Sequence, residues 1–174
     1  MNRVASLLIV TFLIQILIVG CGTKKTKEQL YAEAKRFERN EQYKEAIEVY
    51  EQFVKEYPRA SSADSVLFSI GQIYSNNLAQ FEKSIETHQR LISQYPESKM
   101  GAQSLFMIGY HFANDIKDLD KAKEYYSKFL ASYPNNELCS SVQWELDNLG
   151  KDINDIDFLK SDTKDQTASD SQKH

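Results

Sequence analysis

The sequence predicts an all-α fold, an α-solenoid of three helix pairs followed by one capping helix, and two observations carry this prediction. The first is a repeat: Tyr-Pro steps begin at Tyr57, Tyr95 and Tyr133, at a constant interval of 38 residues. A period of about 20 to 50 residues is typical of solenoids, in which each unit buries its apolar face against its neighbours. The second is the spacing of apolar residues by three and four, which predicts amphipathic helices.

Length and composition agree with one repeat domain. The chain has 174 residues, 41% of them hydrophobic and 26% charged, and only six glycines and three prolines. The formal net charge is -4, and the only Lys cluster lies at 24–27. A chain without a basic field does not attract a phosphate backbone, so we expect no nucleic-acid partner.

The first twenty residues differ from the rest. Arg3 precedes an almost wholly apolar run over 4–19, which is typical of an export signal. The run ends in Ile18-Val19-Gly20-Cys21, which resembles the lipobox of bacterial lipoproteins. The resemblance implies that 1–20 is a signal peptide, that Cys21 is acylated, and that 21–27 is a tether. An uncleaved signal anchor and an ordinary secretory signal are the alternatives.

Seven helices are expected after the tether. Their ranges are 30–39 with 43–56, 61–76 with 81–94, 99–114 with 119–132, and finally 137–151. Pro58 ends the second helix, because proline has no backbone N–H to donate. Asp118 or Asp120 can cap the sixth helix through a side-chain oxygen, and Ser98 can cap the fifth.

The predicted repeat domain spans 28–160. Near its end Ile153, Ile156, Phe158 and Leu159 are expected to fold back as a short clasp. The segment 161–174 has no large apolar residue, so it cannot offset the entropy of ordering and is predicted to be disordered.

The helix pairs resemble tetratricopeptide repeats. The residues that match the first-helix signature are Leu67, Ile70, Gly71 and Tyr74 in the second pair and Leu105, Ile108, Gly109 and Phe112 in the third. The first pair departs from the pattern, with Ala34 at the glycine position. The resemblance covers about 28–152 and implies a right-handed solenoid.

The glycine positions have a physical reason independent of the family. Gly71 and Gly109 lack a side chain where paired helices are expected to approach most closely, with Ala46 and Ala122 as the small surface opposite. In the seventh helix the same position is Asp147, and the preceding signature position is Gln143. Both changes favour a capping helix whose outer face meets water.

One set of aromatic residues recurs at a single repeat position. Tyr31, Phe68, Phe106 and Trp144 stand 37, 38 and 38 residues apart and form a column, flanked by Lys35, Gln72, Tyr110 and Asn148. In the family this face tends to line the concave groove, so the resemblance implies a partner-binding surface. The alternative is that the rings are ordinary core between repeats.

No catalytic or metal-binding pattern emerges. His88, His111 and His174 are not spaced as metal ligands, and His88 is interpreted as a core residue. Asp115, Asp118 and Asp120 lack the glycine and the distal glutamate of a calcium loop, and Cys139 takes a small core position. We therefore expect a protein that is not an enzyme and has no cofactor or metal.

These features together predict a lipid-anchored scaffold that binds a protein or extended peptide in a bacterial envelope. The repeats resemble those of the lipoprotein of the β-barrel assembly machinery and of the Tol-Pal coordinator, which implies the periplasmic face of the outer membrane. A second hypothesis is an accessory subunit that anchors a cell-wall enzyme or transporter. A third, less favoured, is a hydrolase.

Overall fold

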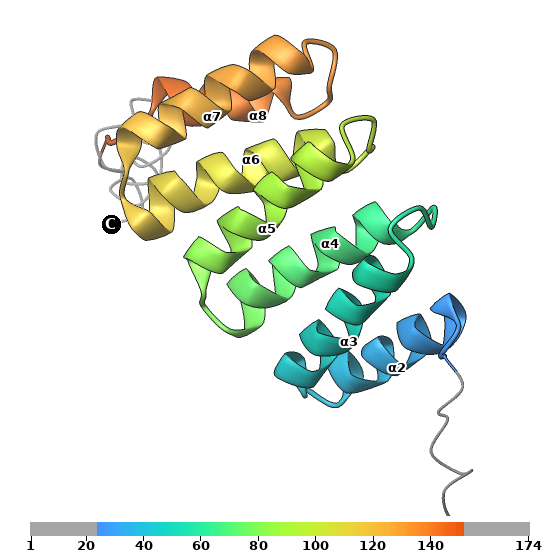
Figure 1. Ribbon diagram of the computed structural model, residues 1–174. Coiled ribbons are helices and arrows are strands. Elements are labelled where there is room, and N and C mark those ends of the chain that lie inside the picture. Colours follow the sequence, from blue (N-terminus) through green and yellow to red (C-terminus); the bar gives the residue numbers. More distant parts are fainter. Residues whose placement is uncertain (1–23, 152–174) are drawn as a thin grey trace, which may run out of the picture.

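The computed structural model describes residues 24–151, and every regular element within that range is helical. The predicted signal peptide, the acylation site Cys21, the clasp residues and the tail 161–174 lie outside the described residues. Figure 1 shows the helices following one another as antiparallel neighbours along the solenoid.

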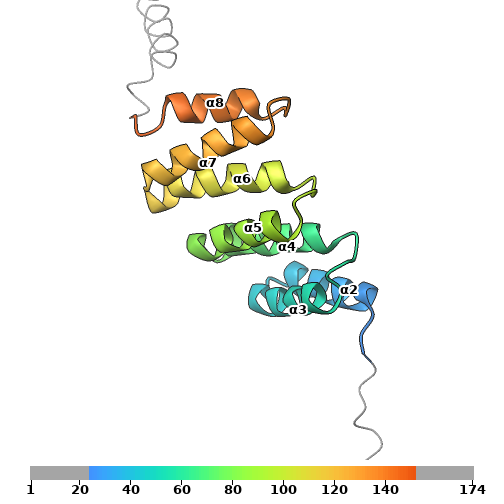
Figure 2. The ribbon, with the colours of Figure 1, turned by 45° about the horizontal axis from the view of Figure 1, so that its top comes forward.

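The helices form three pairs and a final single helix. They are α2 (Lys27–Arg39) with α3 (Tyr43–Glu56), α4 (Ala63–Gln72) with α5 (Phe81–Gln94), α6 (Gly101–His111) with α7 (Leu119–Ser132), and α8 (Cys139–Asp147). Figure 2 shows the pairs stacked as successive layers with α8 at one end. The predicted α-solenoid is confirmed, although α8 is shorter than the expected 137–151.

Two π-helical turns extend the first helices of the second and third pairs. They are η1 (Ile73–Asn77) after α4 and η2 (Phe112–Ile116) after α6, whereas α2 ends without one. A π-helical turn contains one more residue than an α-helical turn. This extra residue accounts for the spacing of 37 from Tyr31 to Phe68 against 38 in the second helices, from Ala46 to Ser84.

The helix starts agree only in part with the sequence. Thr26 caps α2 in a capping box with Gln29, and the Asp118 carboxylate accepts a hydrogen bond from Lys121 N at the start of α7. The predicted cap at Ser98 is wrong, because α6 begins two residues later than expected, after Met100. Ser98 Oγ instead accepts from Met100 N (3.0 Å) and donates to Asp64 Oδ2 (2.7 Å).

Both glycines lie at close contacts, but not opposite the alanines. A Cβ added to Gly109 would lie 2.7 Å from the ring of Tyr126, and one added to Gly71 would lie 2.7 Å from His88 Nε2. The expectation that Ala46 and Ala122 form the facing surface is therefore corrected. A ring one helical turn further along fills that space, and the glycine leaves room for it.

The Tyr-Pro steps join successive repeats. The hydroxyl of Tyr95 donates to the carbonyl of Pro58 in the preceding turn (2.9 Å), and the hydroxyl of Tyr57 donates to the carbonyl of Lys25 (2.6 Å). Each tyrosine thus ties its own turn to the backbone ahead of the preceding first helix. The constant interval of these steps reflects this repeated contact.

The buried apolar side chains form two clusters. The first draws on α2 to α5 and includes Leu30, Tyr50 and Leu67, and the second runs from Ile85 through α6 to Val142 of α8. On the outer side of α8, Gln143 and Asp147 are exposed, as expected for a capping helix.

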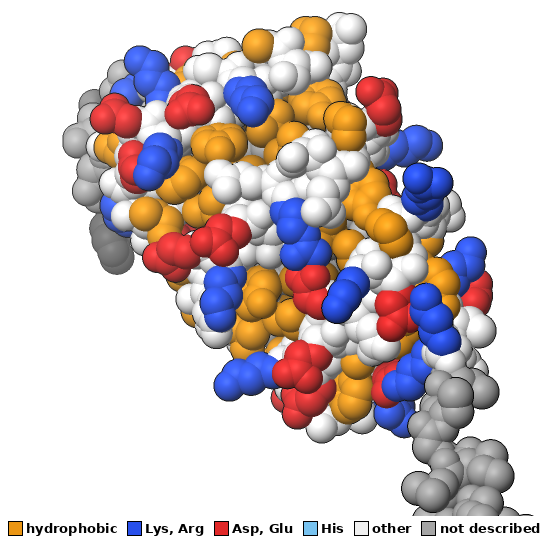
Figure 3. Space-filling model, in the orientation of Figure 1, with side chains coloured by type: hydrophobic (Ala, Val, Ile, Leu, Met, Phe, Trp, Pro, Cys, Tyr) orange, Lys and Arg blue, Asp and Glu red, His pale blue; other side chains and the backbone are white. Residues whose placement is uncertain are grey.

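The surface carries mixed charges. Figure 3 shows Lys and Arg side chains interspersed with Asp and Glu, with hydrophobic side chains visible between them. This mixture agrees with the lack of a basic field in the sequence. Within residues 24–151, no helix has both the length and the apolar character needed to cross a bilayer.

Candidate partner-binding face

The aromatic column lies on the first helices, and its members differ in exposure. Tyr31 on α2 is 41% exposed and Trp144 on α8 is 48% exposed, whereas Phe68 on α4 is 7% exposed and Phe106 on α6 is half-buried. The two ends of the column are therefore accessible, and the middle is partly closed by packing.

Each ring of the three pairs rests on the second helix of its own pair. The ring centroid of Tyr31 lies 6.2 Å from that of Tyr50, and the corresponding distance is 5.1 Å for Phe68 and His88. Phe106 and Tyr126 lie 6.2 Å apart in the third pair. Because α8 is followed by no second helix among the described residues, Trp144 lacks such a ring beneath it.

The flanking row continues the same surface one helical turn further along. Tyr110 is 39% exposed and its ring lies 6.2 Å from that of Phe106, while Gln72 and Asn148 are half-buried. Lys35 Nζ forms an ion pair with Glu38 at 2.9 Å. The row is polar but carries no strong net charge.

A hollow of about 450 Å³ opens beside the last ring of the column. It is bordered by Trp144 and Asn148 of the predicted face and by Leu119, Leu149 and Lys117. Leu119 is 42% exposed, so the hollow has an apolar wall on α7 opposite the indole of α8.

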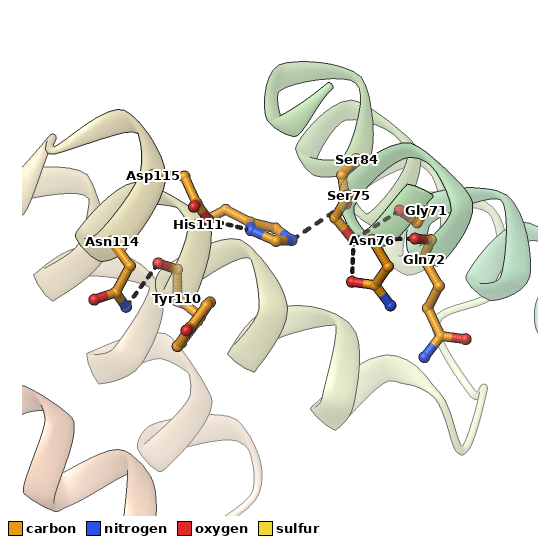
Figure 4. Close-up of polar contacts among 9 residues, drawn as sticks. All are labelled: Gly71, Gln72, Ser75, Asn76, Ser84, Tyr110, His111, Asn114 and Asp115. Carbon is orange, nitrogen blue, oxygen red and sulfur yellow. Dashed lines mark hydrogen bonds and ion pairs between the residues drawn. The ribbon is translucent and has the colours of Figure 1, made fainter. Parts of the chain in front are cut away.

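The sequence analysis missed two amide side chains on this face. Asn76 and Asn114 stand 38 residues apart in the two π-helical turns, and both are exposed. Figure 4 shows Gln72, Asn76 and Tyr110 projecting to the same side of the first helices. The shared interval was the available signal, but an exposed asparagine near a helix end is more commonly a terminus than a site.

Three residues have the hydrogen-bond order of a catalytic triad. Ser84 Oγ lies 3.3 Å from His111 Nε2, and His111 Nδ1 lies 2.8 Å from Asp115 Oδ2 (Figure 4). A nucleophile must reach its substrate, and Ser84 is fully buried at the interface between α5 and α6. This chain of contacts therefore joins helices and gives the serine hydroxyl no access to a substrate.

The core interpretation of His88 is confirmed. Its ring is fully buried, with Nδ1 3.2 Å from Ser104 Oγ and no partner for Nε2. Burial, with a smaller contribution from the nearby His111, lowers the pKa of His88 to about 4. The ring is neutral near pH 7.

Neither the remaining cysteine nor the acidic loop forms a reactive or metal-binding centre. Cys139 is half-buried, and its Sγ donates to the carbonyl of Tyr133 at 3.0 Å. Within residues 24–151 no group of three or more His, Cys, Asp or Glu side chains is placed to hold a metal ion.

The stacked helix pairs, with accessible rings along the first helices, define a helical-repeat protein of the kind that binds other proteins. A family model described as an outer membrane lipoprotein, YfiO, matches residues 23–158, which is more than half of the chain. The chain belongs to this family. The expected likeness to a tetratricopeptide lipoprotein is confirmed, and the family supports an envelope location.

Among curated proteins, none is significantly similar to the chain. Among solved structures, the carboxy-terminal tetratricopeptide domain of an FK506-binding protein from Plasmodium falciparum is similar to it. The two share 16% sequence identity with a TM-score of 0.46, over 81% of this chain and 97% of that domain.

Proposed function

We propose that this protein is a lipid-anchored scaffold of the outer membrane whose aromatic column and flanking row bind an extended segment of a protein partner. Cys21 is its acylation site, the domain lies on the periplasmic side, and the role is in assembly or maintenance of the outer membrane. The family match over residues 23–158 supports the envelope context.

One observation carries the binding face. The exposed large hydrophobic side chains of the described residues are Tyr31, Tyr110, Leu119 and Trp144. Three of them belong to the predicted face, and the fourth borders the same hollow as Trp144. Because large exposed apolar groups that gather on one face commonly mark an interaction site, this concentration favours a docking surface.

Two substitutions at the same repeat position separate binding from packing. Trp144→Ala should leave the melting temperature nearly unchanged but weaken partner binding by about 2 kcal/mol, as loss of an exposed aromatic anchor does. Phe68→Ala should instead cost roughly 3–5 kcal/mol of folding stability, because its ring is buried. Thermal melts and capture of envelope proteins from solubilised membranes measure the two effects.

Gln143→Ala on the outer side of α8 is the matched control, since Gln143 is exposed but lies off the face. It should change neither stability nor capture. A large melting loss for Trp144→Ala with unaltered capture would reduce the column to structural packing. Recovery of one stoichiometric enzyme or transporter, independent of Trp144, would favour the accessory-subunit alternative.

A further inference from the structure

Two histidine–serine hydrogen bonds cross the interface between α5 and α6. His88 of α5 is bonded to Ser104 of α6, and in the opposite sense Ser84 of α5 is bonded to His111 of α6. All four side chains are buried. Figure 4 shows the second of these contacts with Asp115 attached to His111.

The same repeat positions are not filled by such pairs at the other two interfaces between pairs. Counted by the interval of 38, the residues are Ala46, Tyr50, Val66 and Ile73 between α3 and α4, and Ala122, Tyr126, Val142 and Leu149 between α7 and α8. Among the described interfaces, the middle one alone replaces a mainly apolar set with two histidines and two serines. The solenoid therefore carries a polar layer at one specific level.

This polar layer coincides with the division of the hydrophobic core. The buried apolar side chains form one cluster over α2 to α5 and a second that runs from Ile85 through α6 to α8. Ile92, which is half-buried, packs against both clusters. Because apolar burial supplies most of the cohesion between repeats, the interface between α5 and α6 depends more than the others on its hydrogen bonds.

His88 has no group nearby that would stabilise a positive charge. From α4 it meets the ring of Phe68 and the backbone at Gly71, neither of which is charged. From α6 it meets Ser104, and the titratable side chain acting on it from that helix is His111. The carboxylate in this layer, Asp115, is bonded to His111.

We propose that the interface between α5 and α6 is an acid-sensitive hinge, at which protonation of His88 uncouples the unit of α2 to α5 from the unit of α6 to α8. A charged imidazole cannot remain in this apolar site without a counter-ion, so its protonation favours an opened interface that admits water. Phe68 and Phe106 lie on opposite sides of the hinge, so opening changes their separation.

The direction of the pH effect follows from the pKa of His88, which is about 4 in the folded chain against about 6.5 when unfolded. A lowered histidine pKa contributes stability that is complete above about pH 6.5 and is lost as the pH falls towards 4. At pH 5 these two values predict a rise of about 30-fold in the equilibrium constant for opening.

Amide hydrogen exchange of the full chain in detergent, at pH 7 and pH 5 with correction for intrinsic rates, tests the hinge. Protection in α5 and α6 should fall by about 30-fold at pH 5, whereas protection in α2 and α7 should change much less. An equal loss in every helix would mean global destabilisation without a hinge. No loss in α5 and α6 would also overturn the proposal.

The repeat itself supplies the variant that should abolish the effect. Ser84→Ala, His88→Tyr, Ser104→Val and His111→Ile, made together, place at the middle interface the residues of the interface between α3 and α4. This variant should retain protection at pH 5. If it does not fold, the pair His88→Tyr and Ser104→Val tests the same point.

The chain has three histidines, so His174→Tyr is the matched control. It should leave the loss of protection at pH 5 as large as in the unmodified chain. Acid sensitivity that persists in the folded apolar variant would assign the effect to other groups and overturn the role of His88.

Discussion

Tyr50 and Tyr126 show how single residues determine the closeness of a helix pair. They occupy the same repeat position and are both fully buried, yet the Tyr50 hydroxyl donates to Glu38 (2.8 Å) while that of Tyr126 has no partner. Burial raises the pKa of both hydroxyls, and the bond to Glu38 adds to the effect at Tyr50. Tyr126 is therefore held by packing alone, against a glycine that leaves room for its ring.

Gly109→Leu tests this dependence on space. Its side chain would enter the volume of the Tyr126 ring, which a Cβ alone would approach at 2.7 Å, so we expect a loss of roughly 1–3 kcal/mol in the free energy of unfolding. Asp147→Leu stands at the same repeat position on the exposed side of α8 and should cost little. Urea denaturation measures both, and an equal loss would contradict the assignment of α8 as a cap.

Among the elements, α7 has the most specific start signal. The Asp118 side chain accepts a hydrogen bond from Lys121 N at 3.1 Å, and this bond lowers the pKa of the carboxyl. Lys117 precedes it with a φ of 65°, a left-handed conformation that reverses the chain between α6 and α7. Together these residues fix where the second helix of the third pair begins.

Asp118→Ala should lower the free energy of unfolding by about 0.5–2 kcal/mol, because one backbone N–H at the start of α7 loses its acceptor. Asp120→Ala is the matched control, since Asp120 lies in the first turn of α7 but is not its cap. Chemical denaturation of the two variants decides between the alternatives that the sequence left open. A larger loss for Asp120→Ala would reverse the assignment.

The elements also show what the sequence could and could not predict. The interval of 38 and the proline positions predicted every helix pair, because both follow directly from how repeats stack. The π-helical turns were not foreseen, since one extra residue near a helix end leaves only the difference between 37 and 38. The exposure of Trp144 against the burial of Phe68 was equally hidden, because it depends on whether a second helix lies beneath the ring.

For the whole molecule, lipid attachment at Cys21 remains a prediction, since that residue lies outside the described range. Cys21→Ser should move the protein from the membrane fraction to the soluble fraction or leave its signal peptide uncleaved. A single acyl chain binds membranes only marginally, so the mature protein should carry more than one. Fractionation and intact mass of the purified chain measure both outcomes.

Cys139→Ser is the natural control, because Cys139 is the other cysteine of the chain. Its Sγ makes one hydrogen bond inside the domain, so its loss should not change the membrane fraction. An intact mass that still includes residues 1–20, or an unmodified Cys21, would contradict lipid anchoring.

The hydrogen bond from Tyr57 to the carbonyl of Lys25 sets how far this domain can stand from a bilayer. Lys24 is also tied down, with Nζ 3.5 Å from the Glu56 carboxylate. If Cys21 carries the lipid, the four residue steps from Cys21 to Lys25 reach at most about 14 Å. The domain would then work at arm's length from the lipid headgroups, and a client chain would have to come to the membrane surface to be bound.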